Sequence, residues 1–174
     1  MRRLTLITTG GTIEKVYDEG SGALVNRTSQ VRRMLAELRL ENTEISVLEL
    51  MSKDSLDMSD GDRRRILDAA RLAGAEDRGA DAAGIVILHG TDTLAATGEL
   101  LHRELRDIAV PIVLTGAIRP FEMKRSDALQ NLTEALFATA VLGPGVYVVA
   151  HGRALPFPGA RKDHGTGTFV ASSS

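Results

Sequence analysis

The sequence contains no cysteine and no tryptophan, and aromatic residues make up only 3% of its 174 positions. Without cysteine there can be no disulfide bond, no thiol nucleophile and no thiolate metal site. So few aromatic rings leave little material for stacking on nucleic-acid bases. These absences narrow the function classes, although they do not identify the compartment.

Positive and negative charges nearly balance, because the chain has 21 Lys and Arg residues and 23 Asp and Glu residues. The formal net charge is −2. This balance gives no reason to expect nucleic acid or an anionic membrane as a partner. No apolar stretch is long enough to span a bilayer. Arg2 and Arg3 precede an apolar run, but threonines interrupt it and no small-residue cleavage pattern follows, so we expect no secretory signal. We expect a cytoplasmic protein.

The length and the hydrophobic content of 43% predict one domain with a real core. We expect a single α/β catalytic domain over residues 1–171. The three serines at 172–174 look like a disordered or artificial tail.

Short apolar runs alternate along the chain with segments of helical periodicity. Five strands are expected at 4–9, 45–50, 84–88, 111–114 and 145–149, and four helices at 29–38, after Ser59, after Asp92 and at 127–142. This alternation predicts an open parallel sheet with helices on both faces, a three-layer sandwich. We expect the flavodoxin-like strand order 2-1-3-4-5, which places strands one and three beside a switch point. The segment from His151 onward is rich in Pro and Gly and is expected to be a loop or a hairpin.

A glycine pair and a threonine end the first expected strand. Gly10 and Gly11 allow unusual backbone dihedrals and close approach of a ligand, and Thr12 follows at the carboxyl end of the strand. A plain tight turn is the simpler interpretation. A phosphate loop is not expected, since neither a Gly-Lys-Ser/Thr nor the six-residue dinucleotide pattern is present.

Two polar segments follow these first strands. Residues 14–27 form a long polar loop over the end of strand one, which predicts an active-site lid. Residues 51–58 form a second polar loop, which contains Ser52 and Lys53.

The third strand leads into His89-Gly90-Thr91-Asp92-Thr93. In the expected strand order, Thr91 and Thr12 face one crevice. A threonine hydroxyl needs a base or a cation nearby to act as a nucleophile, and the loop lysines Lys162 and Lys124 are available. On residue type alone, Asp92 is better explained as a helix cap and His89 as a structural residue. The histidines have no zinc-site spacing, so no metal site is expected.

Three motifs together resemble those of the bacterial-type L-asparaginases. They are Thr9-Gly10-Gly11-Thr12-Ile13, His89-Gly90-Thr91-Asp92-Thr93 and Thr115-Gly116-Ala117-Ile118-Arg119-Pro120. They stand after the expected strands one, three and four, and the resemblance extends from the N-terminus to about residue 170.

This resemblance implies hydrolysis of the side-chain amide of asparagine, and often of glutamine, without a cofactor. It implies that Thr12 is the nucleophile and that Tyr17 is the tyrosine that the lid brings beside it. Thr91 and Asp92 match the second threonine and the aspartate that binds the substrate's α-amino group, and Lys162 matches the lysine that supports Thr91. Ser52 matches the serine that holds the α-carboxylate. Gly11 and Gly90 would line the substrate through their backbone.

The chain departs from the family in two ways. Lys53 stands where many relatives carry a neutral residue, and it either pairs with the substrate carboxylate or points away. The chain also stops before the smaller C-terminal domain that family members usually carry, so we expect either a naturally short member or a truncated one. We expect a homo-oligomer, a dimer or a tetramer, that covers the surface this domain would cover.

Two other functions remain open at this stage. One is a non-catalytic amino-acid-binding regulatory domain, and the other is a subunit of a larger amidotransferase. The choice between asparagine and glutamine is also open, since one methylene group in such a pocket is worth only about 1–3 kcal/mol.

Overall fold

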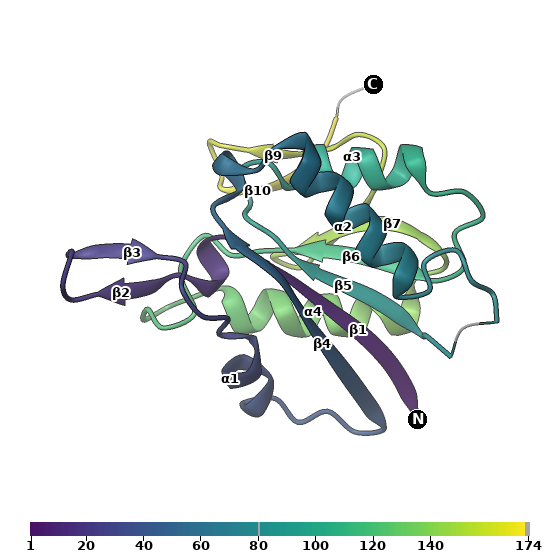
Figure 1. Cartoon of the computed structure of the whole chain (residues 1–174), viewed down its shortest axis with the longest axis horizontal. Helices are drawn as coiled ribbons and strands as arrows, with labels where there is room; N and C mark the ends of the chain where they lie inside the picture. Colours follow the sequence, from purple (N-terminus) through teal and green to yellow (C-terminus); the bar gives the residue numbers. More distant parts are fainter. Residues whose placement is uncertain (80, 173–174) are drawn as a thin grey trace.

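The computed structural model describes residues 1–79 and 81–172, and its centre is a six-stranded sheet in the order β4-β1-β5-β6-β7-β8 (Figure 1). The first five of these strands are parallel and β8 is antiparallel to β7. In chain order they are β1 (Arg2–Gly10), β4 (Thr43–Lys53), β5 (Gly84–Leu88), β6 (Pro111–Thr115), β7 (Gly145–Ala150) and β8 (Arg153–Pro156). The predicted order 2-1-3-4-5 is confirmed, with β8 added at the edge.

Among the described residues, four helices cover the two faces of this sheet and complete the three predicted layers (Figure 1). Helices α2 (Asp60–Leu72) and α3 (Leu94–Glu104) lie on one face, and α1 (Val31–Ala36) and α4 (Ala128–Val141) lie on the other. Strand β5 is buried throughout. Its Ile85 and Ile87 pack toward α2 and α3, while Val86 and Leu88 pack toward α1 and α4. This double burial explains why β5 is a continuous apolar run without polar alternation.

The helix starts agree with the sequence in part. Ser59 caps α2 as predicted, in a capping box: its hydroxyl accepts from the Asp62 N–H, and the Asp62 carboxylate accepts from the Ser59 N–H. Helix α1 begins at Val31, two residues after the predicted start at 29, and Gln30 is its N-cap residue. Ser29 nevertheless helps, since its hydroxyl accepts from the Val31 N–H at 3.3 Å.

Two polar segments are more regular than predicted. The predicted lid loop at 14–27 contains an antiparallel hairpin of β2 (Val16–Asp18) and β3 (Ala23–Val25), which projects from the body of the protein in Figure 1. The predicted loop at 51–58 starts later, because β4 continues to Lys53 before the short 3₁₀ helix η2 (Ser55–Asp57). Strands of three residues and the polar end of an edge strand carry too little apolar pattern to be recognised in the sequence.

The C-terminal segment contains a second hairpin, of β9 (Ala160–Asp163) and β10 (Thr168–Ala171), as one of the two predicted alternatives. Beyond it the Ser172 N–H donates to the Gly159 carbonyl at 2.6 Å. The other two serines of the predicted tail, at 173 and 174, lie outside the described residues. The single-domain boundary at residue 171 stays a prediction. Within the described residues, no helix has the length and apolar character that crossing a membrane requires.

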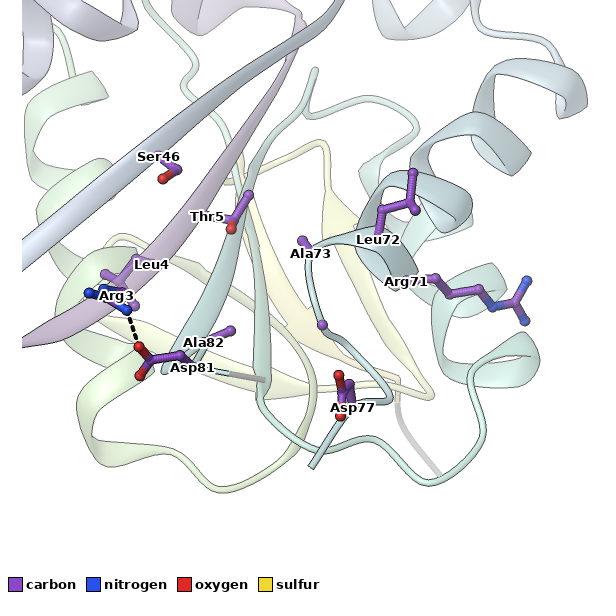
Figure 2. Close-up of a pocket in the computed structure, with 11 residues that line it drawn as sticks. Arg3, Leu4, Thr5, Ser46, Arg71, Leu72, Ala73, Asp77, Asp81 and Ala82 are labelled. Carbon is purple, nitrogen blue, oxygen red and sulfur yellow. Dashed lines mark hydrogen bonds and ion pairs between the residues drawn. The ribbon is translucent and has the colours of Figure 1, made fainter. Parts of the chain in front are cut away.

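A hollow of about 290 Å³ lies at the amino-terminal edge of the sheet, and Figure 2 shows the residues that line it. Arg3, Leu4 and Thr5 of β1 line it together with Ser46 of β4, and Arg3 forms an ion pair with Asp81 there. None of the residues predicted for function lines this hollow. The predicted site belongs to the opposite, carboxyl edge of the sheet.

Packing of α3 against the C-terminal segment gives a stability prediction. A methyl group on Gly98 would collide with the ring of Phe157, so Gly98→Ala should lower the free energy of unfolding by about 1–3 kcal/mol. The matched control is Gly61→Ala in the first turn of α2. There a new methyl group would meet only the Ser59 hydroxyl at 3.5 Å, and the change should be neutral or stabilising. Urea unfolding of both variants measures this, and an unchanged midpoint for Gly98→Ala would contradict the packing.

Candidate active site

The turn after β1 depends on two glycines in left-handed conformations. The φ angles are 94° at Gly10 and 79° at Gly11, which residues with a side chain rarely adopt. A Cβ atom at Gly10 would lie 2.5 Å from the Lys53 backbone nitrogen, and one at Gly11 would lie 2.5 Å from the Gly90 Cα. The turn therefore packs against the ends of both neighbouring strands, β4 and β5. It is followed directly by Thr12, the first residue of the 3₁₀ helix η1 (Thr12–Glu14).

Hydrogen bonds also join the end of β1 to its two neighbours. Thr9 donates its hydroxyl proton to the Leu88 carbonyl at 2.8 Å, and the Gly11 N–H donates to the Lys53 carbonyl at 2.8 Å. As the strand order predicts, the glycine-threonine turns after β1 and β5 thus lie side by side.

A lysine from the C-terminal hairpin completes the cluster after β5. The Lys162 ammonium on β9 donates to the Thr91 hydroxyl at 2.8 Å and to the Asp92 carboxylate at 2.6 Å. Thr91 is buried, and the Lys162 side chain is only 13% exposed. Lys124, the other lysine considered, lies in an exposed loop. The structure therefore brings together Gly11, Gly90, Thr91, Asp92 and Lys162.

Asp92 does not cap α3. The N-cap residue is Thr93, and no side chain makes a capping hydrogen bond there. Instead, Thr93 donates its hydroxyl proton to the Ser55 carbonyl at 2.8 Å, which ties the start of α3 to η2. The Asp92 side chain is 39% exposed, so its carboxylate remains accessible to solvent although it pairs with Lys162.

The loop after β6 packs on the same cluster. A Cβ atom at Gly116 would lie 2.3 Å from the His89 carbonyl oxygen and 3.0 Å from the Thr91 methyl group, so only glycine fits there without displacement. The Gly116 carbonyl accepts from the Asn131 amide at 2.9 Å. This packing holds the third motif against the second.

At the end of β4, the serine that lies next to the cluster is not Ser52, the residue expected from the sequence. Ser52 is exposed, whereas Ser55, which the sequence did not single out, is 1% exposed and lies beside Gly90. A Cβ atom at Gly90 would lie 2.6 Å from the Ser55 hydroxyl. The sequence did contain a signal for this serine, because Ser55 lies three positions after Ser52 and directly follows Asp54. Asp54 does cap η2, since its carboxylate accepts from the Leu56 N–H at 3.1 Å.

The side chains of Lys53 and Tyr17 are not part of the cluster, although the Lys53 backbone borders it. Asp62 holds the Lys53 ammonium at 2.8 Å, which directs it to the start of α2. The carboxylate of Asp62 is stabilised by that lysine and by Ser59, which keeps its pKa far below the usual range. Tyr17 is 58% exposed on the projecting hairpin, and its backbone N–H donates to Glu122. The structure does not bring Tyr17 to Thr12.

His89 is fully buried between the motifs and is satisfied within the protein. Its Nε2 lies 2.8 Å from the Thr97 hydroxyl and its Nδ1 lies 2.8 Å from the Gly90 carbonyl. Burial lowers the pKa of His89 to about 4, with a smaller contribution from the positive charge of Arg63. His89 is therefore neutral near pH 7 and positions the turn rather than transferring a proton. Among the described residues, no group of three or more His, Asp and Glu side chains is placed to hold a metal ion.

Comparison with known proteins agrees with the motifs. The family model "Asparaginase, N-terminal" matches residues 3–171. An L-asparaginase of Thermococcus kodakarensis is 32% identical over 146 residues, which are 84% of this chain and 43% of that protein. A subunit of the glutamyl-tRNA(Gln) amidotransferase of Methanococcus vannielii is 30% identical over 156 residues, which are 87% of this chain and 35% of that protein.

Solved structures agree in fold. The thermostable L-asparaginase from Thermococcus kodakarensis superposes with a TM-score of 0.85 at 30% identity, over 97% of this chain and 51% of that one. L-asparaginase I from Vibrio cholerae gives a TM-score of 0.81 at 25% identity, over 98% of this chain and 51% of that one. The chain thus spans about half the length of the solved structures that it matches.

The buried imidazole of His89 predicts a pH dependence of stability. Its folded pKa is depressed below the unfolded value of 6.5, so between pH 6.5 and about 4 the unfolded chain binds a proton that the folded chain does not. The free energy of unfolding should fall as the pH drops through this window, by up to about 3 kcal/mol from this residue.

Urea unfolding at a series of pH values measures this effect. His89→Gln should remove part of the slope between pH 6.5 and 4, whereas His102→Gln, at an exposed position, should keep the wild-type slope. Parallel slopes for the wild type and His89→Gln would contradict the assignment.

Proposed function

Because the chain belongs to the asparaginase family, whose N-terminal domain it matches, we propose that it is an amidohydrolase that converts L-asparagine to L-aspartate and ammonia. Some activity on L-glutamine is included in the proposal. The observation that carries it is the contact of the Lys162 ammonium with both the Thr91 hydroxyl and the Asp92 carboxylate. A solvated structural lysine has no need of a buried hydroxyl as a partner.

In the proposed chemistry, Thr12 is the nucleophile and Thr91 donates a hydrogen bond to the substrate. The Thr12 oxygen bonds to the side-chain amide carbon of the substrate, its proton is transferred to the leaving nitrogen, and ammonia departs. Water then cleaves the resulting ester, which yields aspartate and restores the Thr12 hydroxyl. Because Lys162 donates to the Thr91 oxygen, the proton of Thr91 must point elsewhere, and in the proposal it is directed to the substrate. Backbone N–H groups at the two strand ends stabilise the oxyanion.

The substrate's charged backbone groups need separate partners. In the proposal the partly exposed Asp92 carboxylate accepts from the α-ammonium group. We assign the α-carboxylate to Ser55 in place of Ser52, because Ser55 lies beside Gly90 and Ser52 is exposed. Lys53 has no role in binding, since Asp62 already holds its ammonium. Tyr17 reaches Thr12 only after the hairpin moves, as a lid would.

Two other functions compete with this proposal. Similarity to the amidotransferase subunit of Methanococcus vannielii supports a protein that hydrolyses an amide within a larger enzyme, which a stable partner protein would reveal. A regulatory domain would bind the amino acid without turnover. Assembly into a homo-oligomer and location in the cytoplasm stay predictions.

Ammonia release from asparagine and from glutamine, assayed in parallel, tests the proposal directly. Turnover of asparagine supports an asparaginase, and turnover of glutamine alone supports the amidotransferase interpretation. Saturable binding of asparagine without ammonia release would favour the regulatory domain.

We expect Thr12→Ala and Thr91→Val each to remove most turnover, by roughly a hundredfold or more, since each deletes a hydroxyl from the reacting centre. Lys162→Met should also lower kcat strongly while aspartate binding persists, because Asp92 and Ser55 still hold the ligand. Circular dichroism checks that the variants fold. Near-wild-type kcat in a folded Thr12→Ala or Thr91→Val protein would remove that residue from the mechanism, and loss of aspartate affinity with an intact kcat would make Lys162 a binding group.

The two serines form a matched pair for substrate binding. Ser55→Ala should raise KM for asparagine and weaken aspartate binding by about tenfold to a hundredfold, because a hydrogen bond to a charged group is worth about 1.5–3 kcal/mol. Ser52→Ala, at the exposed position, should leave both constants unchanged. The opposite result would restore Ser52 as the carboxylate partner.

A further inference from the structure

Glu14 is a buried carboxylate two residues after the proposed nucleophile. It ends the same 3₁₀ helix that begins with Thr12, and it is 2% exposed. No ammonium or guanidinium group pairs with it among the described residues. Burial raises the pKa of Glu14 above its ordinary value, although hydrogen bonds from Ser29, Thr8, Gly10 and Gln30 act in the opposite direction. An ionisable group in this place is costly for the fold, so its contacts need an explanation.

The carboxylate spans two parts of the chain. One oxygen, Oε2, accepts from the Gly10 N–H at 3.2 Å, at the start of the strained glycine turn. The other, Oε1, accepts from the Gln30 N–H at 3.2 Å and from the Ser29 hydroxyl. Gly10 stands two residues before Thr12, whereas Ser29 and Gln30 follow the hairpin of β2 and β3. One side chain therefore closes the base of the hairpin onto the turn that presents Thr12.

Two more contacts lie at the same base. The Asn26 amide donates to the Gly11 carbonyl at 2.8 Å, and the Lys15 ammonium pairs with Asp54 at 2.6 Å. On the arms of the hairpin the side chains of Tyr17 and Leu24 are exposed, and the Tyr17 N–H contacts the body of the protein through Glu122. The hairpin is thus fixed at its base and exposed along its arms, and Glu14 supplies the central contact of that base.

We infer that Glu14 is a positioning residue, which holds the Thr12 turn and the base of the hairpin as one unit so that both meet the substrate together. The inference rests on the proposed function, because it assumes that Thr12 reacts. It needs a carboxylate, since only two acceptor oxygens can serve donors on both sides at once. In Glu14→Gln, an amide N–H₂ group must face either the Gly10 N–H or the Gln30 N–H, and one side of the link is lost.

The experiment compares Glu14→Gln with two control variants. Thr139→Val removes a buried hydroxyl that binds Arg2 at the opposite edge of the sheet, so it should lower stability without affecting Thr12. Glu19→Gln changes an exposed glutamate of the hairpin itself. The readouts are kcat and KM for asparagine, the melting temperature, and cleavage of residues 15–28 by a protease under native conditions.

We expect Glu14→Gln to lower kcat at least about tenfold through misplacement of Thr12, with KM within about twofold of wild type, and to speed cleavage of the hairpin. Thr139→Val should lower the melting temperature and keep kcat and the cleavage rate, and Glu19→Gln should change nothing. A Glu14→Gln protein with wild-type kcat and cleavage overturns the inference. The inference is also overturned if Thr139→Val, at the same loss of melting temperature as Glu14→Gln, shows the same loss of kcat.

Ser29→Ala keeps the inference testable if Glu14→Gln does not fold. It removes one donor at the hairpin side and leaves the Gly10 contact in place, so it should speed cleavage and lower kcat by a smaller factor. Unchanged cleavage and kcat in Ser29→Ala would then overturn the inference. If the wild type releases no ammonia from either amino acid, the proposed function fails, and the cleavage rates alone decide whether Glu14 holds the hairpin.

Discussion

The close approach of two glycine backbones is the constraint on which the site depends. Gly11 and Gly90 leave no room for a methyl group between the ends of β1 and β5. Adjacent parallel strands are ordinarily separated by about 5 Å along the hydrogen-bonding direction, and a side chain between them would push the following turns apart. Here the turns stay in contact, so the hydroxyl-bearing residues next to each glycine share one edge of the sheet. The parallel order of the strands places them there, and the absence of side chains lets them meet.

The lysine shows how a distant segment completes such an edge. Lys162 belongs to a small hairpin outside the main sheet, and Phe169, its partner across that hairpin, is buried in the core. His151, which follows β7, bonds both to Asp127 and to Thr168 of the hairpin, at 2.7 Å and 3.0 Å. Apolar packing and this polar chain together fix the hairpin in place. An ammonium on a four-carbon stem would otherwise sample many positions, at a cost in side-chain entropy on binding Thr91.

The sheet could be predicted from the sequence because its strands are strong apolar runs. The site could be predicted only in part, because several of its residues lie in short polar segments. The run at 84–88 and the motifs after β1 and β5 predict which turns meet, because topology alone brings them together. Ser52 and Ser55 could not be told apart from sequence, since the answer depends on where β4 ends. The two strands of the hairpin at 16–25 have three residues each, which is too few to show the alternation of apolar and polar residues that marks a strand. The contacts of Glu14 join positions that the sequence assigns separately to a lid and to a helix start, so no local pattern reveals them.

The strand order also has a consequence for synthesis on the ribosome. Leu4 of β1 pairs with Ile45 of β4 on one side and with Gly84 of β5 on the other, so β1 is made before either of its neighbours. Until they emerge, its apolar side chains depend on shielding by other means. Lys162 emerges later still, 71 residues after the threonine that it contacts. A nascent chain therefore carries both glycine-threonine turns before it contains the ammonium that contacts Thr91, and the proposed centre forms only after Lys162 has been made.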